Sequence, residues 1–414
     1  MTIAEGVSTL VAYKFYASGA MTENALDDTS TLPGPSGAQL VRRVTSTMDL
    51  VRNNYAATEI RADRQEVDFR LGTGHTAGDI TGEYSGATYF DFIEAVHRDT
   101  RVAALTLTES DLTSATASHS GSSFTFGGGD PVALGLFVGD VVRFANLSVT
   151  ADDAVNFTIL GFSGTSNRVL AVTPAPSDQT ADVAFTLTRP GHTTIVPASG
   201  HVSRKLAIEH YGQDTDYSQL FVENRLWKYV LTMPATGLVT FSTSLMGRWA
   251  YDLSGASAPY FASPTAETTT GITAAVNGIL LLNGTAVGVV TGATITNETV
   301  AAVGEVVGQN FPAAISLGHN QVSGQITAYL NGSTIPALFK AETECALLIG
   351  LDATSAPNTP TTRIYLPRIK FTGATAPVQG EGLQVVTAPF RALRYVGSAA
   401  GVPSTVIRIQ DTEA

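Results

Sequence analysis

Seven histidines are the side chains of this chain best suited to metal binding or acid–base catalysis. A protein metal site places its ligands at short, fixed spacings such as HxH or HExxH, and none of the seven follows one. His210 stands near Asp214 and Asp216, which could hold a cation in a loop, but a solvated turn with Asx hydrogen bonds accounts for these residues more simply. We therefore expect no metal ion and no cofactor. The other six are His75, His97, His119, His192, His201 and His319.

Nucleophilic chemistry also lacks its usual sequence context. The segment Gly161-Phe162-Ser163-Gly164 begins like a nucleophile elbow but does not complete the GxSxG pattern, and the strand-to-helix turn of such an elbow is not predicted there. Neither a Walker-type loop nor GxGxxG is found between a strand and a helix. The single cysteine, Cys345, precedes the apolar run 346–349, which predicts a buried thiol. We expect a protein that is not an enzyme.

Carboxylates are concentrated in the first quarter of the chain, interspersed with arginines. An acid–base pair among them is one interpretation. Mixed charges at a spacing of two residues are more typical of a solvated strand face or of a charge network between subunits. The group contains Glu59, Asp63, Glu66, Asp68, Asp79 and Glu83, together with Arg61, Arg64 and Arg70.

The bulk composition limits the function further. The 414 residues carry a net charge of −12, with pI near 5.0, whereas tight binding to phosphates needs a basic surface. An acidic wall would instead repel a duplex and let it slide. The length predicts two or three domains. Because the first residues do not resemble a signal peptide and no apolar run approaches a membrane span, we expect folding in a cytoplasm without a membrane.

Short runs of alternating apolar and polar residues dominate the chain and predict strands. Examples are 10–16, 227–231 and 363–366. Clusters of Pro and Gly, such as 32–37 and 355–360, separate these runs. The chain is therefore predicted to be mainly β.

An internal similarity at an offset of 246 residues is the most informative feature. Residues 71–95 and 317–341 agree at eight of 25 positions without a gap. In both segments a Gly-x-Ile-Thr strand leads through a glycine turn to a threonine, Thr88 or Thr334, that can cap a short helix. Chance similarity between Gly- and Thr-rich segments is the alternative to a duplication. The positions that define the repeat are Gly78, Ile80 and Thr81 in the first segment and Gly324, Ile326 and Thr327 in the second.

A second similarity, between 237–240 and 382–385, has an offset of 145 residues. The difference between the offsets indicates that about 100 residues are inserted in the first copy. We predict a first copy at 1–100 and 201–255, an inserted small β-barrel at 101–200, and a second copy at 256–414. Runs 135–144, 156–162 and 168–172 are the expected strands of the insert, and the linker between the copies is expected near 254–270.

Several stretches of the sequence resemble the tail tube, or major tail, proteins of long, non-contractile bacteriophage tails. Their order carries more weight than any one of them, and together they span roughly residues 5–395. The stretches are 59–65, 78–83, 89–95, Gly135-Leu136-Phe137-Val138-Gly139-Asp140, Met233-Pro234-Ala235-Thr236-Gly237, Ala258-Pro259-Tyr260-Phe261 and Tyr365-Leu366-Pro367-Arg368-Ile369-Lys370.

The resemblance implies a β-sandwich or half-barrel domain with a short flanking α-helix, assembled into stacked rings whose inner strands close a β-barrel. Genomic DNA would pass through this channel during ejection without being bound tightly. Because the family commonly uses six tube domains per ring, the repeat predicts rings of three chains, with hexamers as the alternative. The insert would lie on the outer surface. Tape measure, tail tip and terminator proteins are the implied partners, in a virion assembled in the cytoplasm of a host bacterium.

Two sets of residues are candidates for roles in such a tube. Glu59, Asp63, Asp79 and Glu83 are the candidate acids lining the channel. The segment 18–39 is the candidate arm to an adjacent ring, with Leu32, Pro33, Gly34 and Pro35 at its turn, and a disordered loop is the alternative.

Two rival functions remain at this point. A surface-binding β protein, such as an adhesin or a carbohydrate-binding module, would explain the strands but not a duplicated unit without a secretion signal. A β-rich hydrolase would need a nucleophile and a base that the sequence does not bring together.

Overall fold

A computed structural model of the chain describes residues 5–17, 32–60, 62–65, 68–287, 289–330, 332–378 and 382–414. Within these residues, one hydrogen-bonded network joins eighteen strands and a separate sheet contains eight. The α-helices of the same residues are short: α1 (Phe90–His97), α2 (Glu109–Leu112) and α3 (Thr334–Lys340). The prediction of a mainly β protein is confirmed.

The first unit, defined by its strands before residue 255, consists of two packed layers. One layer has the order β2–β1–β15–β16–β18, and the other has β3 and β4 beside β5, then β17 and β16. Strand β16 belongs to both layers because its first half pairs with β18 and its second half with β17. The strands are β1 (Thr9–Ala17), β2 (Gln39–Leu40), β3 (Thr45–Ser46), β4 (Asp49–Ala56), β5 (Phe69–Glu83), β15 (Arg204–Gly212), β16 (Tyr217–Pro234), β17 (Thr240–Gly247) and β18 (Trp249–Ser254).

The second unit, formed by the strands from β19 onward, repeats this plan. One layer has the order β20–β19–β23–β24–β26 and the other β21–β22–β25–β24. Strand β14 (His192–Ile195) pairs with β26. The strands are β19 (Gly278–Leu282), β20 (Thr285–Ala286), β21 (Val290–Gly304), β22 (Ala314–Tyr329), β23 (Cys345–Asp352), β24 (Thr361–Phe371), β25 (Val385–Ala392) and β26 (Arg408–Asp411).

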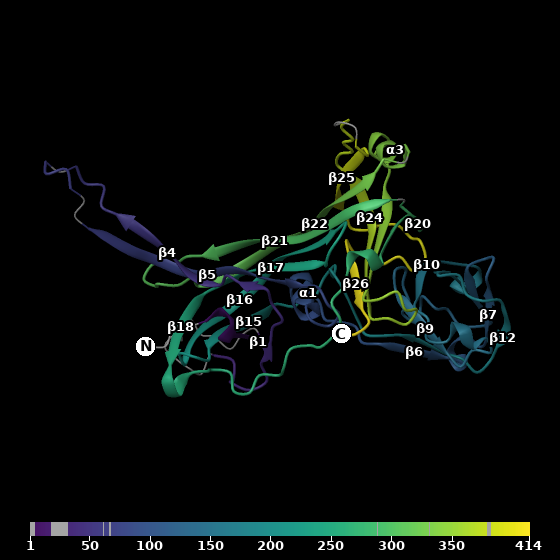
Figure 1. Ribbon diagram of the computed structural model, residues 1–414, viewed down its shortest axis with the longest axis horizontal. Helices are drawn as coiled ribbons and strands as arrows, with labels where there is room; N and C mark the ends of the chain where they lie inside the picture. Colours follow the sequence, from purple (N-terminus) through teal and green to yellow (C-terminus); the bar gives the residue numbers. More distant parts are fainter. Residues whose placement is uncertain are drawn as a thin grey trace.

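The two units share one sheet because β16 also pairs with β21. The resulting continuous sheet has the order β4–β5–β17–β16–β21–β22–β25–β24 and runs across the body of the molecule, while the hairpin β4–β5 projects from it (Figure 1).

The main core lies between the layers and includes residues of both units. Strand alternation explains which side chains enter it: on β17, Phe241, Thr243 and Leu245 are buried and the residues between them are not. Helix α1 covers the first unit with a stripe that includes the buried Phe92 and Ile93, as its sequence predicts.

The insert is a lobe with a hydrophobic core of its own, at the end of the molecule opposite the hairpin (Figure 1). Its strand order is β12–β7–β8–β11–β10–β9–β13–β6. The predicted strand 135–144 begins only at Val141, because Gly139 has a φ of 91° and its Cβ position is occupied by Tyr365. The strands are β6 (Leu105–Thr108), β7 (Ala115–Ser118), β8 (Ser123–Phe126), β9 (Val141–Ala145), β10 (Phe157–Ser163), β11 (Val169–Thr173), β12 (Gln179–Asp182) and β13 (Thr186–Arg189).

The insert is connected along the chain to the first unit, but it packs against the second unit. The side-chain amide of Gln410 on β26 bonds the backbone N–H and C=O of Val141, at 2.6 and 3.1 Å. Arg363 on β24 donates to the Thr158 hydroxyl on β10 at 3.0 Å. The Arg408 guanidinium contacts both carboxylate oxygens of the fully buried Asp140, at 2.7 and 3.0 Å.

Candidate functional site

The exposed face of the continuous sheet is the candidate functional site. The strand register aligns its side chains in rows from β5 to β25, and each of them is exposed or half-buried. Threonine and serine are the most frequent residues of these rows, and the opposite face forms the core. The first row is Thr81, Ser242, Val230, Thr296, Ser323 and Arg391; the second is Glu83, Thr240, Thr232, Thr294, Gln325 and Pro389; the third is Asp79, Ser244, Lys228, Glu298 and Gln321.

Two of the four candidate channel acids lie on this face. Asp79 and Glu83 are exposed on β5, opposite Ser244 and Thr240 of β17. Glu59 and Asp63 are exposed in the loop between β4 and β5, away from the face. The hydroxyl rows contributed by the second unit were missed from the sequence, although the alternation of Thr294, Thr296 and Glu298 along β21 carries the signal.

The basic groups of the face are few and are partly neutralised. Lys228 lies 3.9 Å from the Glu298 carboxylate on the neighbouring strand, and both side chains are about one-third exposed. Arg391 stands at the end of its row on β25. Such a face offers a phosphate backbone little attraction, because affinity for duplex DNA grows with the number of lysines and arginines that contact it.

The positions that define the sequence repeat occupy equivalent places in the two units. Ile80 and Ile326 are fully buried, and their neighbours on the adjacent strand are Thr243 and Ala388. These two neighbours are 145 residues apart, which is the second offset of the sequence. Thr81 and Thr327 follow on the exposed or half-buried side.

The glycines of the repeat are required by a close approach of backbone. A Cβ atom at Gly78 would lie 2.5 Å from the backbone of Met48, and one at Gly324 would lie 2.3 Å from the carbonyl oxygen of Thr294. Both contacts are shorter than any side chain tolerates, so each long strand needs glycine where the outer strand of its hairpin crosses it.

The candidate arm residues lie against their own chain. Pro33 is buried, and its carbonyl accepts a hydrogen bond from the Tyr260 hydroxyl at 2.6 Å. The Gly34 carbonyl accepts a bond from the Lys14 ammonium, and the Pro35 carbonyl one from the backbone of Ala262. Leu32 contributes to a small apolar cluster. The preceding part of the candidate arm, 18–31, lies outside the described residues. The element that projects from the body is the β4–β5 hairpin (Figure 1).

The candidate catalytic groups are not assembled into a site. Among the described residues, no group of three His, Cys, Asp or Glu side chains could hold a metal ion. Burial lowers the pKa of His97 to about 3, and its ring bonds the hydroxyls of Tyr229 and Thr194 inside the core. Burial raises the pKa of Cys345 to about 11, which keeps its thiol protonated. Within the part of the chain that is described, no helix is long and apolar enough to cross a membrane.

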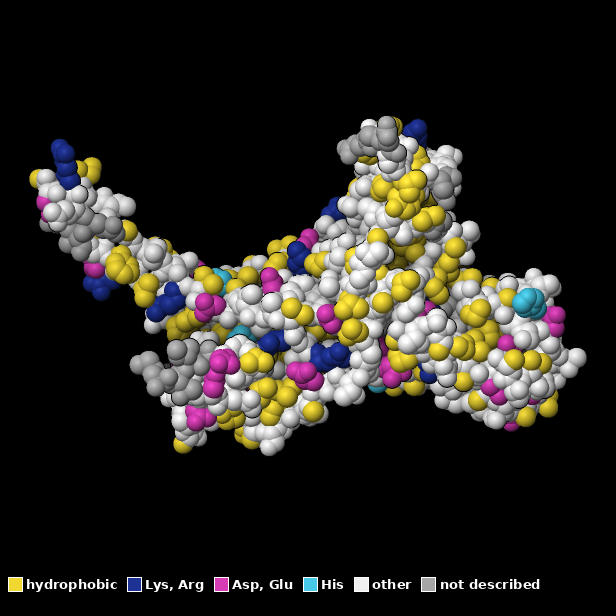
Figure 2. Space-filling model, in the orientation of Figure 1, with side chains coloured by type: hydrophobic (Ala, Val, Ile, Leu, Met, Phe, Trp, Pro, Cys, Tyr) yellow, Lys and Arg dark blue, Asp and Glu magenta, His cyan; other side chains and the backbone are white. Residues whose placement is uncertain are grey.

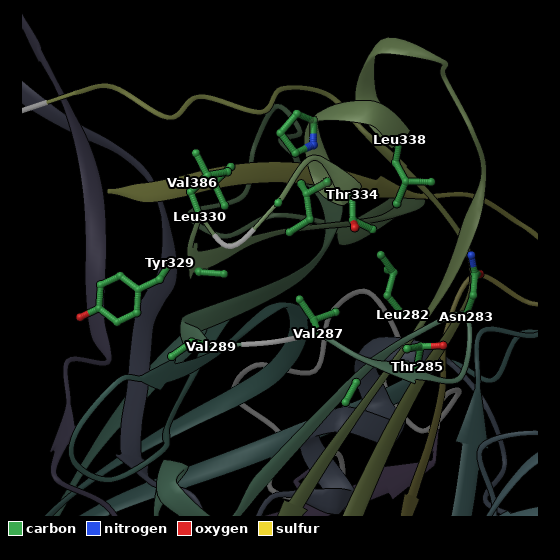
Figure 3. Close-up of a pocket in the computed structure, with 15 residues that line it drawn as sticks. Leu282, Asn283, Thr285, Val287, Val289, Tyr329, Leu330, Thr334, Leu338 and Val386 are labelled. Carbon is green, nitrogen blue, oxygen red and sulfur yellow. The ribbon is translucent and has the colours of Figure 1, made fainter. Parts of the chain in front are cut away.

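A hollow of about 390 Å³, lined by both apolar and polar residues, opens in the second unit beside α3. The side chains of Leu282, Val287, Leu338 and Val386 surround it (Figure 3). The equivalent space in the first unit contains rings: Tyr89 stacks on Phe241 at 4.6 Å, and Phe92 lies 4.9 Å from Tyr13. The second unit has smaller side chains at these positions, so the volume that aromatic rings fill in the first unit stays open in the second.

Filling this hollow is expected to stabilise the protein. Val386 lies opposite Ala328 on β22 as Phe241 lies opposite Gly82 on β5. The replacement Val386→Phe should raise the free energy of unfolding by about 1 kcal/mol, because it buries more apolar surface without displacing packed atoms. The reverse replacement, Phe241→Val, should lower it by about 2 kcal/mol by opening a cavity. Urea unfolding of both variants measures the two effects, and destabilisation by Val386→Phe would show that the hollow cannot accept a ring.

A comparison with known protein families finds a match that includes much of the continuous sheet. A family model described as phage tail tube protein matches residues 207–392, from β15 through the β16–β21 pairing to the end of β25. The matched segment, 186 of the 414 residues, is similar to phage tail tube proteins. No curated protein matches the chain. This match confirms the resemblance found in the sequence.

Proteins of this family are structural components of phage tails, so the match supports a structural role. Because they assemble into a tube of many subunits, the open sheet edges and the exposed sheet face of this chain are candidate surfaces for assembly. The matched segment includes the strands on both sides of the junction between the units.

Proposed function

We propose that three copies of this chain form a ring, that the rings stack into the tube of a long, non-contractile phage tail, and that the exposed face of the continuous sheet lines the channel for double-stranded DNA. The observation that carries the proposal is the continuous sheet itself, in which two similar four-stranded halves stand side by side with their cores on the same side. Such a sheet is an arc that further copies can close into a barrel.

Two tube domains per chain are supported by the strand pairing. The pairs β4–β5, β5–β17 and β15–β16 of the first unit have counterparts β21–β22, β22–β25 and β23–β24 in the second. A helix follows the long hairpin in each unit, at α1 and at α3. The first domain would comprise 1–100 and 201–255, the second 256–414, and the insert 101–200 would decorate the outside.

The composition of the sheet face supports its role as channel lining. Its rows of threonine and serine present hydroxyl groups, and Asp79 and Glu83 add negative charge at one side. Hydroxyls keep the surface wet, and carboxylates repel phosphates, so a duplex would pass without adhering. Tape measure protein would occupy this channel before DNA, with tip and terminator proteins at the two ends of the tube.

Electron microscopy of the purified protein tests the proposal. Negative-stain images are expected to show rings or tubes with a central channel, and class averages should show three chains that present six similar domains per ring. Monomers that persist across protein and salt concentrations would contradict the tube. Six chains per ring, with twelve tube-like domains, would retain the tube but contradict the ring of three.

A further inference from the structure

The continuous sheet ends in two open edges, one at β4 and one at residues 372–378, which continue β24 beside β25. Within the described residues, β4 pairs with β5 alone, and the N–H groups of Ala374 and Ala376 have no backbone partner. Open edges recruit strands from other chains. We propose that these two edges pair with each other between neighbouring copies of this chain, with Thr375 opposite Asp49 of the next copy. This contact rests on the ring proposed above and specifies how the ring closes.

The junction between the two units inside the chain is the template for the contact. There, β16 of the first unit pairs antiparallel with β21 of the second, and Val230 stands opposite Thr296. The counterpart of β16 in the second unit is β24 with its continuation, and the counterpart of β21 in the first unit is β4. Each chain therefore has one further edge of each type: the continuation of β24 corresponds to β16, and β4 corresponds to β21.

The register follows from the pairing partners of each strand. Val230 pairs with Ser242 of β17, and Thr375 with Thr387 of β25, so the two partners are 145 residues apart. On the other side, Thr296 pairs with Ser323 of β22. Asp49 pairs with Ala77 of β5, which is 246 residues before Ser323. Thr375 thus corresponds to Val230, and Asp49 corresponds to Thr296. Because Val230 and Thr296 pair inside the chain, the same register places Thr375 opposite Asp49 of the next copy.

The direction of the backbone groups agrees with this register. Thr375 and Thr387 exchange both of their backbone hydrogen bonds, at 2.9 and 2.8 Å, so the neighbouring Ala374 and Ala376 direct their N–H groups to the open side. On the other edge, the N–H of Thr47 donates to the carbonyl oxygen of Asp79 at 2.9 Å, so Met48 directs its backbone outward.

The outward groups meet each other in the proposed pairing. Ala376 would stand opposite Met48 of the next copy, and Ala374 opposite Leu50. In the single chain, the Leu50 N–H donates instead to the carboxylate of the adjacent Asp49, at 2.7 Å. A shift by one residue would turn the donors of one edge away from those of the other, so the register is specific.

Exposed apolar surface marks the edge that the contact would cover. Val378 is 84% exposed, whereas Met233, which stands 145 residues earlier at the junction inside the chain, is 8% exposed. Pairing with a neighbouring copy would bury Val378 as the template buries Met233, which adds a hydrophobic contribution to the backbone hydrogen bonds.

Charge complementarity extends the contact beyond the strands. In the template, the loop between β21 and β22 reaches back over the first unit, where the Asn310 carbonyl accepts the Gly74 N–H at 2.8 Å. By the same symmetry, the acidic loop between β4 and β5 would reach over the second unit of the next copy. The ends of β24 and β25 present basic residues there: Arg391 and Arg394, together with Arg368 and Lys370, which share the carboxylate of Glu344. Opposite charges of this kind favour correct docking.

Disulfide trapping in the full-length protein tests the contact. Thr375 and Asp49 would form a non-hydrogen-bonded pair, whose Cα atoms lie about 4.5 Å apart, within the range of a disulfide. Within one chain they stand at opposite ends of the sheet, about 34 Å apart by strand spacing. The double variant Asp49→Cys, Thr375→Cys can therefore link only different chains. The native Cys345 is buried and does not interfere.

The matched control moves one cysteine four residues along β4, to Asn53, which lies about 13 Å out of register. After mild oxidation, the Asp49 variant is expected to give covalent trimers on non-reducing gels, with a yield roughly tenfold above that of the Asn53 variant. Ladders that extend to six chains would retain the edge pairing while removing the ring of three.

Other outcomes separate the contact from the function. Tubes in electron micrographs together with cross-linking of the Asn53 variant, or of neither variant, would overturn the proposed pairing and leave the tube role intact. Protein that forms no rings at all, with or without the cysteines, would overturn the proposed function and this contact with it.

Discussion

Replacement of Asp140 by alanine is expected to lower the free energy of unfolding by about 3–5 kcal/mol, because it leaves buried guanidinium groups without their counter-charge. Asp140 is fully buried and accepts bonds from Arg408 on the body. Arg189 of the insert lies 3.7 Å away and is also buried. Burial lowers the pKa of Arg189, and the Asp140 carboxylate opposes this shift. The carboxylate therefore compensates positive charges from both sides of the docking surface.

Denaturant unfolding at low protein concentration measures this effect without the contribution of assembly. The matched control is Asp68→Ala, which removes a carboxylate from an exposed ion pair with Arg70, where the N–O distance is 3.0 Å and the side chains are 55% and 83% exposed. An exposed pair contributes less than about 1 kcal/mol, so the control should unfold nearly as the parent protein does. Equal stabilities of the two variants would show that Asp140 is not needed for docking.

Reversal of charge on the sheet face is expected to spare assembly and to impair DNA ejection. The double variant Asp79→Lys, Glu83→Lys places new ammonium groups on exposed positions of β5, outside the core. If this face lines the channel, the lysines of every ring bind phosphates of the passing duplex. Because such binding is cumulative along a tube, the ejection rate should fall by at least roughly tenfold and recover as salt rises.

The control for this variant makes the same change of charge on the insert, with Glu109→Lys and Asp178→Lys at exposed positions of that lobe. It should assemble and eject DNA as the parent does, because the insert lies away from the sheet face. Ejection is measured by release of DNA from purified virions at several salt concentrations. An unchanged rate in the Asp79 and Glu83 variant would contradict the assignment of this face to the channel.

Charged side chains are dispersed over the face of the molecule that Figure 2 shows. Lys, Arg, Asp and Glu stand among white and yellow surface, and the hairpin carries both signs of charge. Dispersed charges agree with the low charged fraction of the sequence, 14%. The surface is suited to contacts made by backbone and by hydroxyl groups more than by dense ion pairs.

Much of the fold could be predicted from the sequence because its signals are local. Alternation predicted β1 at Leu10–Tyr16, and the apolar stripe after Thr88 predicted α1. The repeat predicted which strands would be followed by a helix. The two offsets recur in the strand registers, where Ile80 pairs with Thr243 and Ile326 pairs with Ala388. The division of the chain into two copies remains a prediction.

The rest depends on contacts between distant segments, which local pattern does not encode. Tyr217–Pro234 forms one strand shared by two layers, although only 227–231 was predicted as strand. Its pairing with β21 joins residues about seventy positions apart, such as Val230 and Thr296. The candidate acids Glu59 and Asp63 were grouped with Asp79 by charge alone, and a loop separates them from the sheet face.

The docking of the insert has a consequence for the shape of the whole chain. Its ends are covalently joined to the first unit, while Gln410 and Arg408 bond it to the second. Because this lobe is attached to both units, bending of the sheet at the β16–β21 junction would strain these buried bonds. The insert thus limits how far the two units of one chain can move relative to each other.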